Sequence, residues 1–220
     1  MSNARDNILA RLRAVVPQND FATPEPNAIP GVELSRADKV ARLKQRMEAM
    51  HAEVVVTDAK GWIDTLKEVL RKRALNGLLY APATALGEAL AAAWDNDLPP
   101  LVGYTQDVEQ VRERLFAIDA GITSTHGGLA DVGALILWPD SDEPRLMSLA
   151  PALHIAVLEA AKIHDSLAQA IAQERWQDGM PTNILLISGP SKTADIELVL
   201  TFGVHGPKEL IVLILDDERG

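Results

Sequence analysis

The chain has 220 residues, of which 47% are hydrophobic but only 4% aromatic, so its core must consist mainly of alanine, leucine, isoleucine and valine. Its net charge of −10 argues against a nucleic-acid groove, which needs a basic stripe, and against an anionic membrane surface as a partner. No cysteine is present, which excludes disulfides and thiolate ligation of an iron–sulfur cluster. With a polar start and no apolar run of about 18 residues, the sequence predicts a cytoplasmic protein without a membrane span.

Residues 1–34 are predicted to form an arm in front of the main domain. Apolar side chains recur at helical spacing within 1–16, which indicates a short amphipathic helix. Prolines at 17, 24, 26 and 30 then mark a loop without a regular pattern. We expect residues 35–220 to form a single α/β domain.

From residue 35 onward, helical and strand patterns alternate along the chain. The helical patterns cover 35–50, 62–73, 83–94 and 107–115. The strand patterns cover 53–57, 78–81 and 101–104. Strands that alternate with helices of this length are typical of βαβ crossovers and a largely parallel sheet. We therefore predict an α/β fold with a mostly parallel open sheet flanked by helices.

Residues 116–138 follow a different, strand-like pattern that glycines interrupt. The segment is too short for a full crossover helix, so we expect a hairpin or a tight βαβ-like excursion there. A further strand is predicted over 154–158 and a helix over 163–176. His154, at the start of that strand, is interpreted as a buried histidine whose ring is satisfied by hydrogen bonds, with a ligand role as the alternative.

The C-terminal part is predicted to form one strand–loop–helix–loop–strand unit. The short apolar run 184–187, which a Ser-Gly-Pro turn ends, predicts a buried strand. Apolar residues at 196, 199, 200 and 202 recur at helical spacing, so a helix is expected to begin at Ser191 or Thr193. The apolar run 210–215 predicts the second buried strand.

The loop before that helix carries chemical groups that bind anions. A helix start presents unpaired backbone N–H groups and a partial positive charge. Ser188, Ser191 and Thr193 add hydroxyls, Lys192 adds a positive charge, and Gly189 permits close approach of the backbone. These groups can cradle a carboxylate or phosphate at the carboxyl edge of the sheet, although a helix cap explains the same residues. The glycine spacing excludes an ordinary P-loop.

The turn after the predicted helix adds His205 and Gly206 to the candidate ligand site. His205 either caps the turn or donates a hydrogen bond to a substrate carboxylate. The five histidines of the chain lack the i, i+4 spacing of a helical metal site, so no metal site is predicted.

Three segments carry a resemblance to a known family. Ser-Gly-Pro-Ser-Lys-Thr-Ala-Asp-Ile-Glu at 188–197, followed by Gly-Val-His-Gly-Pro at 203–207, resembles the C-terminal signature of the LutC/YkgG lactate-utilisation family, the LUD domain. Ser-Leu-Ala-Pro-Ala-Leu-His-Ile at 148–155 resembles a second pattern of that family. Ala-Asp-Val-Gly-Ala at 130–134 resembles its central segment more loosely, because the family commonly has Ala-Glu-Thr-Gly-Thr there.

The resemblance implies a fold similar to NagB, ribose-5-phosphate isomerase (RpiA) and the CoA transferases. It also implies a role in oxidising L-lactate to pyruvate within a multi-subunit system. The iron–sulfur clusters of that system are expected on partner subunits, and no cofactor is expected on this chain. Asp131 stands where the family has a glutamate. It is either the remnant of an acidic site residue, with Lys192 as its candidate partner, or a turn carboxylate.

The first hypothesis is therefore a subunit that binds a small anionic ligand and does not carry the redox centre. The predicted ligand-binding residues are Ser188, Gly189, Ser191, Lys192, Thr193, His205, Gly206 and Asp131. The alternatives are a stand-alone enzyme or a sensor that acts on a small phosphorylated or CoA-linked acid. A CoA-transferase mechanism needs a glutamate that forms an acyl anhydride, and the central segment offers only Asp131, which counts against that enzyme.

Overall fold

The computed structural model describes residues 4–15, 33–104, 115, 117–194, 200–202 and 206–218. The chain divides into two compact units, Met1–Gly31 and Val32–Gly220. The first unit contains helix α1 (Ala4–Val15), whose apolar residues Ile8 and Leu12 are exposed. This helix confirms the predicted N-terminal one, whereas the helix predicted over 107–115 lies almost wholly outside the described residues.

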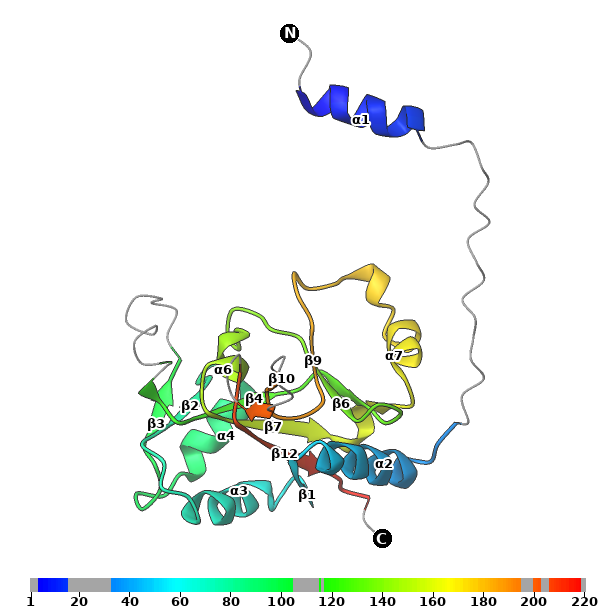
Figure 1. The fold of residues 1–220 in the computed structure, drawn as a ribbon. Coiled ribbons are helices and arrows are strands. Elements are labelled where there is room, and N and C mark those ends of the chain that lie inside the picture. Colours follow the sequence, from blue (N-terminus) through cyan, green and yellow to red (C-terminus); the bar gives the residue numbers. More distant parts are fainter. Residues whose placement is uncertain are drawn as a thin grey trace. The chain divides into compact units, whose positions relative to one another are not determined.

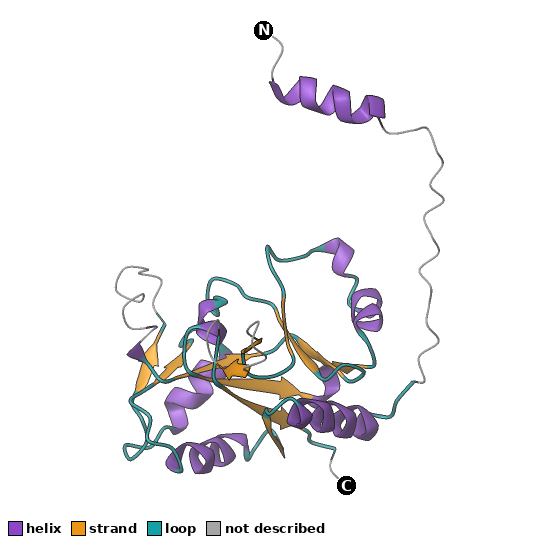
Figure 2. Cartoon of the chain, viewed as in Figure 1, coloured by secondary structure: helices purple, strands orange, loops and turns teal. Residues whose placement is uncertain are grey.

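The larger unit is built on a six-stranded sheet in which every described strand runs parallel to its neighbours (Figures 1 and 2). In spatial order its strands are β1 (Glu53–Thr57), β12 (Glu209–Leu215), β7 (Leu153–Glu159), β4 (Ala120–Ser124), β2 (Leu78–Tyr80) and β3 (Leu101–Gly103). The longest apolar runs form β7 and β12, which lie inside the sheet with both faces covered. The predicted α/β fold with a parallel open sheet is therefore confirmed.

A second, mixed sheet packs on one face of the first. Its strands, in spatial order, are β8 (Ile163–His164), β5 (Gly127–Leu129), β6 (Ala134–Leu137) and β9 (Leu185–Ile187). β5 and β6 pair as an antiparallel hairpin, which confirms the hairpin predicted within 116–138. Its turn requires Gly133, which has φ +66°; a Cβ there would lie 2.4 Å from the Cβ of Arg46.

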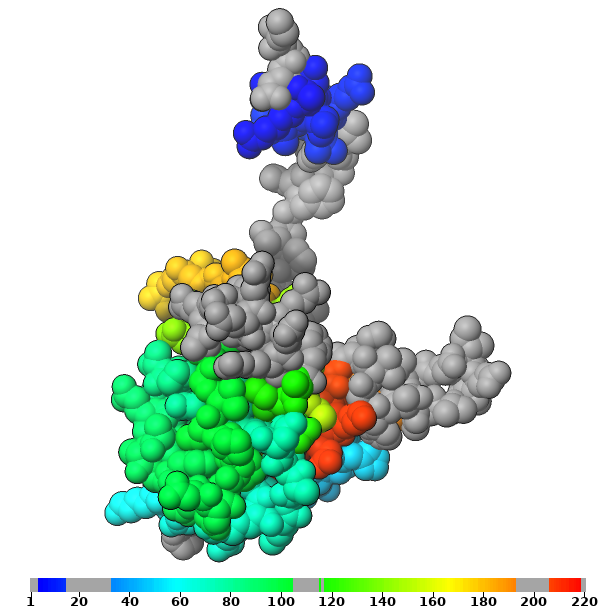
Figure 3. Space-filling view, turned by 90° about the vertical axis from the view of Figure 1, so that its left-hand side faces the viewer, coloured from blue at the N-terminus to red at the C-terminus, as the bar shows by residue number. Residues whose placement is uncertain are grey.

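Helices and the second sheet cover the two faces of the main sheet. Helices α3 (Trp62–Arg71) and α4 (Ala85–Ala93) bury Leu66, Leu70 and Leu90 against one face. On the β3 side of the larger unit, the segments from α3 to β3 form one continuous surface (Figure 3).

The opposite face is covered by helix α2 (Arg36–Ala49) together with β6. Leu43 of α2 and Leu135 of β6 share an apolar cluster with Leu158 and Val212 of the main sheet. The hydroxyl of Ser35 caps α2 by accepting from the backbone N–H of Asp38, as a serine before a helix favours.

The shorter helices connect these layers. Helix α6 (Leu146–Leu149) precedes β7, and helix α7 (Leu167–Gln173) follows β8. A single 3₁₀ turn, η1 (Ala160–Lys162), follows β7, and another, η2 (Trp176–Asp178), follows α7. None of the helices in the described ranges combines the length and apolar character that crossing a membrane requires.

The predicted helix over 163–176 is partly wrong. Ile163 and His164 form β8, because they pair in parallel with β5. The helix begins only at Leu167, where the hydroxyl of Ser166 caps it by accepting from the backbone N–H of Gln169.

The predicted strand–loop–helix–loop–strand segment at 184–215 differs more from the structure. β9 is a strand, but it lies at the edge of the second sheet, where Leu186 is 50% exposed, and it is neither buried nor part of the main sheet. Where the spacing predicts a helix, β10 (Lys192–Ala194) and β11 (Leu200–Phe202) pair as antiparallel strands. Their register sets Thr193 opposite Thr201, and β-branched and aromatic residues suit paired strands better than a helix.

Candidate functional site

A polar strip crosses the face of the main sheet that α2 covers. On this face one apolar cluster contains Leu158 and Val212, and another contains Leu79 and Met147. Between these two clusters, β4 and β7 place polar side chains on this face of the sheet. The residues that alternate with them, such as Ile122 and Ile155, belong to the apolar cluster on the other face. The strip therefore places hydrogen-bonding groups inside an otherwise apolar core.

Thr123 and His154 form the centre of this strip. His154 is fully buried, and its Nε2 lies 2.9 Å from Oγ1 of Thr123. Gly121 stands directly opposite His154 in the register, where a Cβ would lie only 2.5 Å from the carbonyl oxygen of Met147. The absent side chain lets α6 sit directly on β4, which brings Ser148 to the same strip.

His154 has one ring nitrogen without a partner. Burial lowers the pKa of His154 to about 3, so its ring is neutral near pH 7. A neutral imidazole carries one N–H and one lone pair, and both need partners when they are buried. Nε2 has Thr123, whereas Nδ1 has no hydrogen-bond partner among the described residues. The prediction of a fully satisfied histidine is therefore only half right.

A cavity of about 250 Å³ adjoins His154, and we name it the Ser188 cavity. It is lined by Ser148, Leu149, His154, Leu186, Ile187, Ser188, Gly189, Ser191, Gly206, Pro207 and Leu210. Four predicted ligand-binding residues therefore meet in one place: Ser188, Gly189, Ser191 and Gly206. The backbone N–H of Ser191 donates to the carbonyl of Pro207 (2.8 Å), which holds the two loops together.

The Ser188 cavity lies near the amino ends of the parallel strands, not at their carboxyl ends as predicted. His154 and Leu210, the second residues of β7 and β12, form part of its wall. The prediction failed because β9, which leads into the Ser188 loop, belongs to the second sheet. Gly189 also packs against the end of α2: a Cβ there would lie 2.8 Å from the carbonyl oxygen of Met50, the residue that follows the helix.

Two of the other predicted residues, Lys192 and Asp131, do not line this cavity. Lys192 is exposed in β10, and the backbone of Thr193 follows it in the same strand. Asp131 is half-buried in the turn between β5 and β6, and its backbone N–H donates to the carbonyl of Asp165 (3.0 Å). His205 lies outside the described residues.

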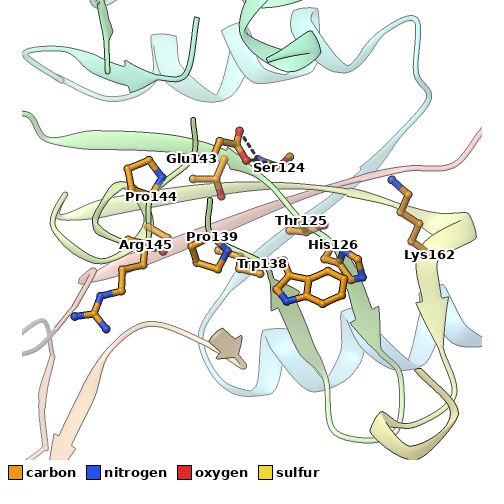
Figure 4. Close-up of a pocket in the computed structure, with 12 residues that line it drawn as sticks. Ser124, Thr125, His126, Trp138, Pro139, Glu143, Pro144, Arg145 and Lys162 are labelled. Carbon is orange, nitrogen blue, oxygen red and sulfur yellow. Dashed lines mark hydrogen bonds between the residues drawn. The ribbon is translucent and has the colours of Figure 1, made fainter. Parts of the chain in front are cut away.

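A second cavity, of about 170 Å³, opens beside the carboxyl end of β4, and we name it the β4 cavity (Figure 4). It is lined by Thr123, Ser124, Thr125, His126, Leu137, Trp138, Pro139, Glu143, Pro144, Arg145, Ser148 and Lys162. Ser148 lines both cavities, and the hydrogen bond between Thr123 and His154 joins their walls.

Glu143 anchors one side of the β4 cavity. Both of its carboxylate oxygens accept from the backbone N–H of Ser124 at 3.1 Å, and one also accepts from the Ser124 hydroxyl. Burial raises the pKa of Glu143; the hydrogen bonds from Ser124 oppose this rise, and Asp140 and Asp142 add to it. Figure 4 shows this pair apart from His126 and Trp138, which lie together elsewhere in the cavity wall.

His126 belongs to a polar cluster centred on Glu174. The Glu174 carboxylate lies 2.7 Å from Nε2 of His126 and 2.6 Å from Nε2 of His164, and it accepts from the indole N–H of Trp176 at 2.6 Å. Burial alone would raise the pKa of Glu174, but the hydrogen bonds from Trp176, His126 and His164 together hold it below its usual range. Within the described ranges, no three acidic or histidine side chains are arranged to hold a metal ion.

Thr123, Ser148 and His154 were not among the predicted site residues, although sequence signals for them exist. Polar residues at inward positions of a buried strand are unusual, and Thr123 and His154 both occupy such positions. Ser148 and His154 also stand at the two ends of the Ser-Leu…His-Ile segment that carries the family resemblance. Nothing local in the sequence, however, indicates that these segments lie side by side.

Comparison with known proteins identifies relatives over almost the whole chain. A family model described as the LUD domain matches residues 40–215. An uncharacterized protein from Neisseria meningitidis serogroup B is 34% identical over 221 residues, covering 97% of this chain and 94% of that protein. Lactate utilization protein C from Bacillus subtilis is 30% identical over 194 residues, covering 83% of this chain and 80% of that protein.

A solved structure resembles the larger part of the fold. The crystal structure of a DUF162 family protein from Deinococcus radiodurans superposes with a TM-score of 0.59, covering 84% of this chain and 100% of that one. The two sequences are 18% identical, so this likeness bears on the fold alone.

Proposed function

This chain belongs to the LUD domain family, since the family model matches residues 40–215, and we propose that it is a component of an L-lactate utilisation system. The family resemblance read from the sequence is thereby confirmed. Support for the role comes from lactate utilization protein C of Bacillus subtilis, which is similar to this chain over most of its length. The two share 30% identity, so the role is carried over as a proposal.

Within that system the chain binds a short carboxylate in the Ser188 cavity. The observation that carries this step is the unpartnered Nδ1 of the buried His154 in the cavity wall. If Nε2 accepts from the Thr123 hydroxyl, Nδ1 carries the proton and donates to a carboxylate oxygen. Hydroxyls of Ser188 and Ser191 supply further donors, whereas the Ser148 hydroxyl donates to the carbonyl of Arg145 (2.9 Å).

The cavity lining also suggests which acids fit. Leu149, Leu186, Ile187 and Leu210 give it an apolar part, which suits the short carbon chain of lactate or pyruvate. No cationic side chain lines it among the described residues, which disfavours the phosphorylated acids of the alternative hypothesis. Lys192 follows Ser191 in the chain and is exposed, so it favours anions through longer-range attraction. His205, the sequence neighbour of Gly206, stays in the proposed site as a further donor.

We propose that the redox centre lies on other subunits. Lactate oxidation must pass electrons to an acceptor, and this chain has no cysteine to hold an iron–sulfur cluster. We therefore propose iron–sulfur partner subunits, with this chain as the component that binds the substrate or product acid.

Calorimetric titration with pyruvate tests the ligand site. His154→Gln and Ser188→Ala should each weaken binding, the first about ten-fold because a buried charge-assisted hydrogen bond is lost. Lys192→Ala should weaken it only about two- to five-fold, since an exposed charge is screened by salt. Asp131→Asn is the control, because Asp131 does not line the cavity. Unchanged affinity in both His154→Gln and Ser188→Ala would contradict the proposed site.

Affinity purification from the native cells tests the role in the larger system. A tagged chain isolated from cells grown on L-lactate should bring with it iron and an activity that reduces an artificial electron acceptor with L-lactate. The same chain purified alone after recombinant expression should lack both. Turnover of L-lactate by the isolated chain would overturn the accessory role.

A further inference from the structure

Helix α1, drawn in blue in Figure 1, presents an apolar face to solvent. Ile8 and Leu12 are four residues apart, so their side chains lie one above the other on the same side of the helix. Ile8 is 58% exposed and Leu12 is 59% exposed. Burial of two side chains of this size in an apolar environment is strongly favourable. This face is therefore a contact surface that neither cavity explains.

The length of α1 favours a contact with another molecule. The helix has 12 residues, and an isolated helix of that length is only marginally stable in water. Helices in proteins gain most of their stability from the packing of an apolar face. Because Ile8 and Leu12 are exposed, most of that contribution is unused in α1. A groove that buries both side chains would supply it.

The charges of α1 favour an acidic partner. The helix contains three arginines and one aspartate, which gives it a net charge of +2. The whole chain carries −10, so the rest of the chain carries −12. Arg5 and Arg11 stand three residues before and after Ile8, which places one guanidinium group on either side of the apolar face. Carboxylates at the rim of a groove would pair with these arginines while the groove buries the apolar side chains.

A lipid surface fits α1 less well than a protein groove. Basic amphipathic helices do lie in anionic membrane interfaces, where tryptophan, phenylalanine and leucine side chains enter the acyl region. Helix α1 contains no aromatic residue, and its large exposed apolar side chains are Ile8 and Leu12. The charge of −12 on the rest of the chain opposes its approach to anionic headgroups. A short apolar face with basic flanks therefore favours a protein partner.

From this arrangement we infer that α1 is a docking helix, which places Ile8 and Leu12 in an apolar groove of a different protein whose rim carries carboxylates. Arg5 and Arg11 pair with that rim and fix the direction in which the helix lies. Docking through α1 goes beyond the proposed function, because it assigns the contact to one face of this chain. It stands whether or not the partner carries a redox centre.

Site-specific photocrosslinking of the full chain in its native cells tests this contact. With the photoreactive residue p-benzoylphenylalanine in place of Leu12, the chain should crosslink to one partner protein. The same residue in place of Ala10 should give no crosslink to that protein, because Ala10 lies on the opposite side of the helix. Mass spectrometry of the crosslinked peptide identifies the partner, and aspartate or glutamate residues should flank the site of attachment.

Two aspartate variants of the tagged chain test the apolar face directly. Leu12→Asp should reduce the amount of the partner that copurifies about ten-fold, because a buried leucine is lost. Ala10→Asp is the matched control: it makes the same charge change at an exposed position and also lowers helix propensity, but it should leave the partner bound. Arg11→Gln should weaken retention and make it less sensitive to salt.

The crosslinks also separate this inference from its alternatives. Crosslinks from position 12 to a lipid, to a second copy of this chain or to nothing would overturn the inference. Equal loss of the partner in Leu12→Asp and Ala10→Asp would overturn it as well. A crosslinked partner that takes no part in L-lactate oxidation would support the docking helix and contradict the proposed function.

Discussion

Acidification is expected to destabilise this protein mainly through His154. The pKa of the buried ring is lowered to about 3, while an exposed histidine titrates near 6.5. Between these two pH values the unfolded chain binds more protons than the folded one. The contribution of His154 to the free energy of unfolding is therefore fully present above pH 6.5 and is lost as the pH falls toward 3. The slope is about 1.4 kcal/mol per pH unit, which gives a loss of about 2 kcal/mol at pH 5 and a ceiling of about 5 kcal/mol.

Urea unfolding followed by circular dichroism at about pH 7.5, 6 and 5 measures this loss. His154→Gln should remove the part of the slope that His154 causes, although its stability at neutral pH is lower. Thr123→Val separates the hydrogen bond from the titration: it removes the partner of Nε2 and should lower stability at every pH by about 1–3 kcal/mol. Identical pH slopes in the wild type and His154→Gln would show that His154 does not control acid stability.

Binding of a carboxylate at His154 should also stabilise the folded protein. A buried polar atom without a partner costs free energy, and a bound carboxylate offsets that cost by accepting from Nδ1. A short acid that binds the folded state alone should therefore stabilise the protein in proportion to its occupancy. Because His154→Gln removes the donor, this protection should be lost in the variant.

The parts of the fold that the sequence predicts best are those with strong local patterns. β12 is one continuous apolar run, buried on both faces, and α2 has both a Ser35 cap and a regular apolar face. The parts that were mispredicted are short strands whose pairing is decided by distant segments. β9, β10 and β11 have three residues each. Over so short a segment, the apolar spacing within 196–202 is as compatible with a helix as with a hairpin.

The candidate site was predictable only in part, for the same reason. Ser188 and Gly206 do meet in one cavity, as their shared polar loops suggested. His154 and Thr123 lie two residues apart in the register of neighbouring strands but 31 apart in the sequence, and no local pattern encodes that register. Tertiary pairing therefore decides which polar residues share a site.

Gly121→Ala should test whether the close contact of α6 with β4 builds both cavities. A Cβ at Gly121 would lie 2.5 Å from the carbonyl oxygen of Met147 and 3.0 Å from Pro151, and a backbone carbonyl cannot swing aside as a side chain can. The helix must then move away from the strand, at a cost of about 1–3 kcal/mol, as for other overpacked cores. Thermal and urea unfolding measure that cost.

The displacement should also reach the proposed carboxylate site, because α6 carries Ser148, which lines both cavities. Pyruvate affinity should fall in Gly121→Ala even at temperatures where the variant is fully folded. Gly103→Ala is the matched control: it also adds a methyl group to a strand of the main sheet, but the nearest atom is Cγ of Pro82 at 3.4 Å, an ordinary contact. It should leave both stability and affinity nearly unchanged. A Gly121→Ala protein that is destabilised yet binds pyruvate normally would separate the packing of α6 from the carboxylate site, and Ser148 would then have no part in binding.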